Sequence, residues 1–104
     1  MFKTFKKTIK SKDRLNLYYE TYITDGVQPK IFFVHGAGGD LDAWQYVKDE
    51  LLQKGFSSIA MDLRGHGYSG HPRSLKSYSL DNFAEDIAEI LKAEKIEKIF
   101  ITTA

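Results

Sequence analysis

The stretch IFFVHGAGG, residues 31–39, decides the fold of this chain. Its first part is a continuous apolar run, which is typical of a strand that is buried on both faces. The run passes directly into glycines, which let the backbone turn sharply and bring unpaired amide groups to face a ligand. We therefore predict a buried strand over residues 30–34, followed by a tight turn into a helix.

Apolar residues after the glycines follow a helical period. They are Trp44, Val47, Leu51 and Leu52. Their spacing predicts an amphipathic helix over residues 41–54, with Asp40 or Asp42 at its start and Gly55 as its stop. A second apolar run predicts a strand over residues 56–61, which ends at Asp62. A strand, a helix and a strand in this order predict a right-handed parallel crossover.

The flanking segments complete an α/β pattern. Strands are predicted over residues 3–10 and 15–23, joined by a polar turn into an antiparallel hairpin. Residues 63–78 are rich in glycine, serine and basic residues and are predicted to be a loop. Ser79 is expected to cap a second helix over residues 80–93, and residues 98–102 are expected to form a third buried parallel strand. The acidic residues of that helix are predicted to face water: Asp81, Glu85, Asp86 and Glu89.

Composition restricts the classes of protein that the chain can belong to. A length of 104 residues allows one domain at most, and 42% hydrophobic with 28% charged residues excludes a disordered chain. The absence of cysteine excludes disulfide scaffolds and thiol catalysis, and we expect neither a metal site nor a cofactor. Basic residues gather in the first 14 positions without stacking aromatics, so we expect a solvated strand face and no nucleic-acid partner. No apolar run approaches ~20 residues, so we expect a cytoplasmic protein without a membrane span.

The glycine turn fits two kinds of anion site. In a dinucleotide-binding domain it would hold a pyrophosphate, with the signature G-x-G-x-x-G and an acid after the next strand. Gly36 and Gly38 match that signature and Leu41 does not, although Asp62 could meet a ribose hydroxyl and Arg64 a 2′-phosphate. In acyl transfer the same amides would form an oxyanion hole for the tetrahedral intermediate.

A second stretch, DLRGHGYS at residues 62–69, favours the acyl-transfer interpretation. Together with HGAGG at residues 35–39, and at a spacing of one helix and one strand, it resembles the N-terminal part of the α/β-hydrolase fold superfamily. The resemblance covers essentially the whole chain, residues 1–104, but only the first part of that family's domain. It implies an α/β fold with two helices and the strand order 1-2-4-3-5, in which the last strand lies at an edge.

The resemblance also implies roles for individual residues. The backbone N–H of Ala37, with Gly38 as its neighbour, is expected to contribute to the oxyanion hole. Binding-site positions beside this turn are expected to be His35, Gly36 and Trp44. Residues of the second motif are expected to hold their loop in place: Asp62, Arg64, Gly65, His66, Gly67 and Ser69. A triad of Ser69, His66 and Asp62 is disfavoured, because triad members normally come from different elements of a fold.

The family's nucleophile elbow, G-x-S-x-G, does not occur among the 104 residues, and its acid and base follow the elbow. The chain is therefore expected to be the N-terminal fragment of a serine-type hydrolase that acts on a small-molecule ester or related acyl substrate, and to be inactive alone. Phe100 and Ile101 would lie at an unpaired edge, which predicts self-association or a second polypeptide that completes the sheet. Two alternatives stay open: a non-catalytic or split-enzyme interaction module, and an NAD(P)-binding domain.

Overall fold

The N-terminal hairpin forms one border of the sheet in the computed structural model, which describes residues 1–36 and 38–103. Strands β1 (Phe2–Lys10) and β2 (Asn16–Thr24) pair antiparallel along their whole length. The side chains of β1 are mostly exposed, whereas β2 alternates between buried and half-buried positions. Strand β1 therefore presents the solvated face that was expected for the basic N-terminal segment.

The sheet has five strands in the order β1-β2-β4-β3-β5, which confirms the predicted topology. Strand β3 (Ile31–Val34) lies between β4 (Ser58–Met61) and β5 (Phe100–Thr103) and is parallel to both. Strand β4 joins this parallel part to the hairpin through an antiparallel pairing with β2. The carboxyl ends of β3 and β4 consequently lie side by side, and both sequence motifs begin there.

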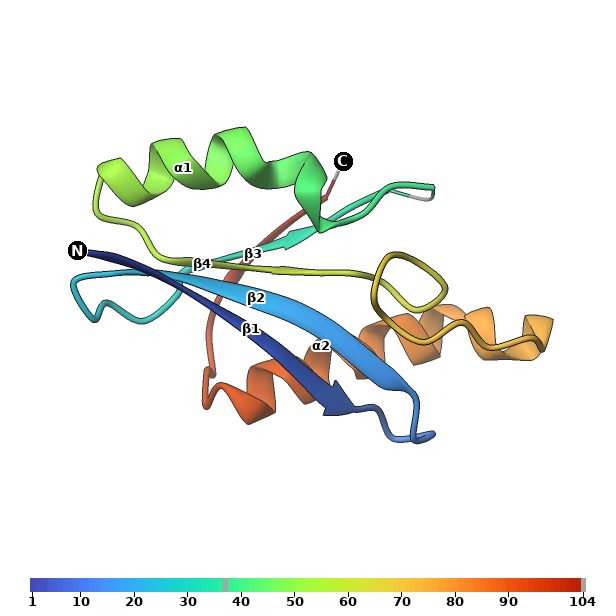
Figure 1. Ribbon diagram of the computed structural model, residues 1–104. Coiled ribbons are helices and arrows are strands. Elements are labelled where there is room, and N and C mark those ends of the chain that lie inside the picture. Colours follow the sequence, from blue (N-terminus) through green and yellow to red (C-terminus); the bar gives the residue numbers. More distant parts are fainter. Residues whose placement is uncertain (37, 104) are drawn as a thin grey trace.

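Helices cover the sheet on opposite faces, so the molecule has three layers (Figure 1). A 3₁₀ turn, η1 (Leu41–Trp44), leads into α1 (Gln45–Gln53) on one face, and α2 (Leu80–Ala93) covers the other. Because successive strand residues point to opposite faces, Phe33 packs on the α1 side and Phe32 on the α2 side. The α1 side contains Tyr22, Phe33, Leu41, Leu52 and Ala60, and the α2 side contains Tyr19, Phe32, Val34, Ile59, Met61, Ile90 and Ile96.

The first helix differs in detail from the prediction. Asp40 caps it by accepting a hydrogen bond from the Asp42 amide, but the first turn is a 3₁₀ turn. Val47, which was expected in the buried stripe, is 43% exposed, whereas Leu52 of the same helix is buried. Gly55, with φ +87°, ends the helix as expected, and β4 begins only at Ser58.

The second helix corrects one prediction. Ser79 caps α2 by accepting from the Asn82 amide, as expected. Asp86, however, is completely buried and does not face water, because it pairs with the guanidinium of Arg64. The predicted loop before α2 also contains a short 3₁₀ turn, η2 (Leu75–Tyr78).

Strand β5 leaves one edge of the sheet open within the described residues. Phe100 is 79% exposed and Ile101 is 50% exposed, so the strand is not the buried element that its apolar run suggests, but the open edge that the strand order implies. No helix in the described part of the chain is long and apolar enough to cross a membrane.

Candidate functional site

The two sequence motifs meet at the carboxyl ends of β3 and β4. His35, the first residue after β3, is buried, and its Nε2 accepts a hydrogen bond from the Leu63 amide at 2.9 Å. Its Nδ1 lies 2.7 Å from the carbonyl oxygen of Gly36, which can only accept, so Nδ1 carries the proton. His35 therefore joins the glycine turn to the start of the second loop.

A second histidine joins the same two loops from the opposite direction. The Gly38 amide donates to Nε2 of His66 at 3.0 Å, and Nδ1 of His66 lies 3.1 Å from the carbonyl oxygen of Arg64. The centroids of the His35 and His66 rings are 4.9 Å apart. Gly38 has φ +82°, a conformation that glycine adopts without strain.

The predicted oxyanion donors are only partly placed by this geometry. Ala37 lies outside the described residues, so its role stays a prediction. The Gly39 amide closes the turn by donating to the Gly36 carbonyl at 3.1 Å, and the Gly38 amide is held by His66. An anion at Gly38 would therefore have to displace the imidazole.

Asp62 holds the loop that follows β4 and is 1% exposed. One carboxylate oxygen accepts from the Leu41 amide at 2.8 Å, and the other accepts from the Tyr68 amide at 2.9 Å. A Cβ added to Gly67 would collide with this carboxylate. Asp62 thus fixes both the start of η1 and the return of its own loop.

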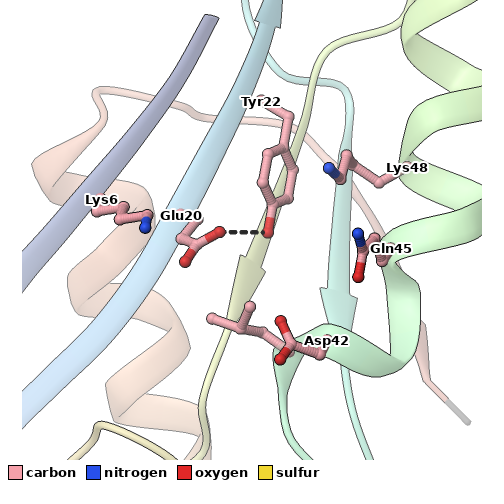
Figure 2. Close-up of a pocket in the computed structure, with 7 residues that line it drawn as sticks. Lys6, Glu20, Tyr22, Asp42, Gln45 and Lys48 are labelled. Atoms are coloured by element: carbon pink, nitrogen blue, oxygen red, sulfur yellow. Dashed lines mark hydrogen bonds between the residues drawn. The ribbon is translucent and has the colours of Figure 1, made fainter.

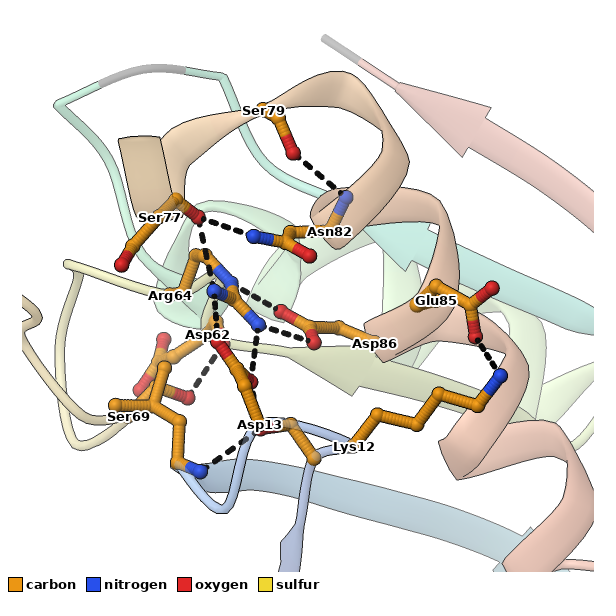
Figure 3. A network of polar contacts seen from close by, with 12 residues as sticks. Lys12, Asp13, Asp62, Arg64, Ser69, Ser77, Ser79, Asn82, Glu85 and Asp86 are labelled. Atoms are coloured by element: carbon orange, nitrogen blue, oxygen red, sulfur yellow. Dashed lines mark hydrogen bonds and ion pairs between the residues drawn. The ribbon is translucent and has the colours of Figure 1, made fainter. Parts of the chain in front are cut away.

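Arg64 forms the centre of a polar network that joins three elements (Figure 3). Its guanidinium donates to both carboxylate oxygens of Asp86 in α2 at 2.7 Å and to both oxygens of Asp13 in the hairpin turn at 2.9 and 3.0 Å. A fifth bond of 2.8 Å reaches the carbonyl oxygen of Ser77. All five N–H groups of the side chain are therefore used. The next residue is Gly65, where a Cβ would collide with the ring of Tyr78.

The network also changes proton affinities. Hydrogen bonds from Arg64 and Ser11 lower the pKa of Asp13 to about 2. The hydrogen bond to Asp86 raises the pKa of the Arg64 guanidinium, against the opposing effect of burial. The Asp13 carboxylate therefore stays charged at neutral pH and continues to bind the arginine.

The Ser69 hydroxyl is hydrogen bonded to backbone groups on both sides. The residue is 2% exposed, its hydroxyl donates to the Asp62 carbonyl at 2.5 Å, and it accepts from the Tyr18 amide at 2.8 Å. Neither His66 nor the Asp62 carboxylate is hydrogen bonded to this hydroxyl. The three residues do not form a triad.

Trp44 lies against the core beside the glycine turn. Its ring stacks on Phe33 with centroids 4.8 Å apart, and its indole N–H has no hydrogen-bond partner among the described residues. The side chain is half-buried. The expected role of Trp44 in the binding site stays a prediction.

A polar groove on the α1 face of the hairpin was not predicted from the sequence (Figure 2). Glu20 accepts hydrogen bonds from the hydroxyls of Tyr18 at 2.6 Å and Tyr22 at 2.9 Å, and burial together with Glu20 raises the pKa of both tyrosines. Lys48 lies 4.6 Å from the centre of the Tyr22 ring. The alternation of Tyr18, Glu20 and Tyr22 along β2 is the signal that could have revealed it.

Among the described residues no group of three metal-ligating side chains occurs here or elsewhere.

The geometry weighs against a dinucleotide site. Asp62, the residue expected to meet a ribose, is buried and already accepts from two amides. Arg64, the residue expected to meet a 2′-phosphate, has every donor occupied by protein. Neither side chain is available to a nucleotide.

Comparison with known proteins identifies the family of this chain. Residues 29–102 match the family model described as the alpha/beta hydrolase fold. Protein ABHD8 of Homo sapiens is 39% identical over 62 residues, which are 60% of this chain and 14% of that protein.

Two solved structures illustrate the likeness of the fold. The epoxide hydrolase VrEH1 of Vigna radiata matches 96% of this chain and 32% of its own with a TM-score of 0.84 at 21% identity. A thioesterase domain from the curacin biosynthetic pathway matches 97% of this chain and 35% of its own, with a TM-score of 0.82 at 22% identity. The chain thus spans about a third or less of each of these proteins. With the family's sheet order and both of its sequence motifs in place, this chain belongs to the α/β-hydrolase fold family.

Proposed function

We propose that the chain is the N-terminal part of a serine-type hydrolase that acts on a small-molecule ester or related acyl substrate. The observation that supports this is the placement of the glycine turn. It lies directly after the central parallel strand β3 and is braced from the neighbouring strand's loop by His66 and by the Asp62 carboxylate at Leu41. A fixed turn with backbone amides is what an oxyanion hole requires, because the donors must be in place before charge develops.

The residues of the site divide into two groups in this proposal. Ala37 would supply an oxyanion N–H, with Gly38 beside it, while His35, Gly36 and Trp44 would shape the approach to the turn. The second motif would act indirectly. Its buried carboxylate and guanidinium hold the loop that carries His66, and both are enclosed by protein groups rather than open to a substrate. We place the complete enzyme in the cytoplasm.

Residues 1–104 alone should not catalyse acyl transfer. They contain no G-x-S-x-G elbow, and the most elbow-like serine, Ser69, is buried and hydrogen bonded on both sides. Without nucleophile and base, only binding and part of the oxyanion stabilisation would remain.

Two assays test this proposal. A fluorophosphonate probe, which labels activated serines, should leave the chain unlabelled, and 4-nitrophenyl acetate should be hydrolysed no faster than in buffer. Turnover that disappears in Ser69→Ala would contradict the proposed role of the chain.

A third test uses the gene. The coding sequence beyond codon 104, read in all frames, should encode a Ser-x-Gly elbow followed by a helix. Its absence from every frame would count against the hydrolase.

A second candidate function is that of an interaction module or one half of a split enzyme. The exposed edge of β5, where Phe100 and Ile101 are open to solvent, supports it, since an unpaired edge can accept a further strand. Co-expression with the polypeptide encoded downstream should yield a 1:1 complex that reacts with fluorophosphonate. A downstream polypeptide that is inert and does not bind would exclude the split enzyme.

A further inference from the structure

We propose that His66 is a positioning residue for the glycine turn and that it holds Gly38 only while its imidazole is neutral. Acidification would then release the turn, and the catalytic consequence of that release rests on the proposed function above. His66 reaches the turn from 28 residues away along the chain, through the 3.0 Å contact between its Nε2 and the Gly38 amide.

The protonation state follows from the two contacts of the ring. The Arg64 carbonyl oxygen, 3.1 Å from Nδ1, can only accept, so Nδ1 carries a proton. The Gly38 amide can only donate, so Nε2 must present its lone pair. Both contacts together are compatible with the neutral Nδ1–H tautomer alone. An imidazolium would place an N–H group opposite the Gly38 N–H, and the contact would be lost.

The anchor on the other side of the ring is rigid. Arg64 is 1% exposed and its side chain makes five hydrogen bonds, to Asp13, Asp86 and Ser77, so its carbonyl has little freedom to move. Gly38, in contrast, has nothing within 4 Å of the place where a Cβ would lie, so it can shift toward that side without a collision. Protonation of His66 would therefore move the turn and not the arginine.

Other ionisable groups lie on the elements around His66. They are His35, Asp62, Arg64, His71 and Tyr78. His35 is itself a neutral Nδ1–H tautomer, because its Nε2 accepts from Leu63. It is 3% exposed, whereas the His66 ring is half-buried and more accessible to a proton. The centroids of the two rings are 4.9 Å apart.

The remaining groups have partners of their own. The Asp62 carboxylate accepts from two amides, the Arg64 guanidinium is neutralised by two aspartates, and the Tyr78 hydroxyl donates to the Pro72 carbonyl. His71 contacts only the Gly67 carbonyl and is exposed. The Gly38 contact is thus the bond among these that protonation of an accessible ring would break.

Two nuclear magnetic resonance measurements on the full chain test the proposal without any assay of activity. At pH 8 the ring nitrogen shifts of His66 should report the Nδ1–H tautomer. Between pH 8 and 4 the Gly38 amide shift should follow the same midpoint as the His66 ring. After correction for intrinsic exchange, hydrogen exchange at Gly38 should accelerate by about tenfold across that midpoint, as expected for the loss of one hydrogen bond.

Variants make the test specific. His66→Gln keeps a neutral acceptor and should remove the midpoint from the Gly38 signal, while His71→Gln, which alters an exposed histidine of the same loop, should leave it unchanged. An Nε2–H tautomer in the wild-type chain, or a Gly38 amide that is constant while His66 titrates, would overturn the proposal even if the variants do not fold. These signals do not depend on hydrolysis, so a linked titration of His66 and Gly38 would support this inference even if no reading frame beyond codon 104 encodes a Ser-x-Gly elbow and the proposed function fails.

Discussion

At the scale of single residues, Arg64 determines how the second motif is held. A buried guanidinium is tolerated only where its donors are satisfied and its charge is balanced. Asp86 supplies a fully buried partner and Asp13 a half-exposed one, so the two contributions differ in kind. The arginine therefore joins the hairpin, the motif loop and α2 through bonds of unequal strength.

Replacing Asp86 should be costly. Asp86→Asn removes the fully buried counter-charge of Arg64, and loss of one partner of a buried pair typically costs about 3–5 kcal/mol. Because Asp13 still binds the guanidinium, we expect about 3 kcal/mol, measured as the change in free energy of unfolding in urea. Asp81→Asn is the control, since Asp81 lies exposed in the first turn of the same helix. Equal effects of the two variants would show that the buried pair contributes nothing.

Asp13 gives the protein a stability that depends on pH. Its pKa is about 2 in the folded chain, below its ordinary value of 3.8, so its stabilising effect is complete above pH ~4. That contribution should be lost as the pH falls from ~4 to ~2, because the folded state then resists protonation that the unfolded chain accepts. The loss should be small, since the carboxylate is 45% exposed and screened by solvent.

Thermal unfolding at intervals between pH 5 and 2 measures this effect. The difference in Tm between wild type and Asp13→Asn should shrink as the pH falls through this window. A difference that stays constant from pH 5 to 2 would mean that Asp13 is not paired with Arg64 in solution.

At the scale of elements, the motif loop depends on the absence of side chains at its glycines. Gly67 has φ +50°, and a Cβ there would strike the buried Asp62 carboxylate. Gly26 also has a positive φ, +71°, but has open space around it. Both positions penalise alanine for its backbone conformation, and only Gly67 adds a collision.

This contrast gives a matched pair of variants. Gly26→Ala should cost about 1 kcal/mol, the usual strain of a non-glycine residue at positive φ. Gly67→Ala should cost about 2–3 kcal/mol more, because the clash must displace a buried carboxylate or the loop itself. Urea unfolding of both variants decides the matter. Similar losses would show that the loop moves aside without breaking the bonds of Asp62.

The elements were predictable from the sequence because their signals are local. The apolar run before the glycines, the helical period after them and the serine cap at Ser79 each lie within one segment. The partners of the motif residues were not predictable in this way. Asp13 and Asp86 lie 51 and 22 residues from Arg64, and the helical pattern alone placed Asp86 among its water-facing neighbours.

The same limit applies to the candidate site. The resemblance indicated which residues belong to it, but the contact between Gly38 and His66 spans 28 positions and requires that β3 and β4 be adjacent. The strand order supplied that adjacency. The polar groove on β2 was missed because its tyrosines and Glu20 also read as an ordinary half-buried strand.

At the scale of the whole molecule, the three layers are unequally complete. Strands β2, β4 and β3 are covered by packed side chains from the helices, and their central residues are fully buried. Strand β5 pairs with β3 on one side only, and its two large apolar residues face solvent. The molecule therefore combines a closely packed centre with an exposed apolar edge at β5.

The exposed edge of β5 should make the isolated chain self-associate. Phe100→Lys places a charge where an approaching strand or apolar surface would bind, a device by which natural sheets protect their edges. In sedimentation velocity the wild type should show a sedimentation coefficient that rises with concentration, and Phe100→Lys should shift the chain toward monomer and lower the fluorescence of a bound hydrophobic dye. Leu75→Lys is the control for the change in polarity. Leu75 is 89% exposed but lies in η2, away from the sheet edge. If the position at the edge of β5 drives association, Leu75→Lys should associate like the wild type. A wild-type chain that is monomeric at all concentrations and binds no dye would contradict the open edge, and equal relief by both variants would show that exposed apolar area in general, and not β5, drives association.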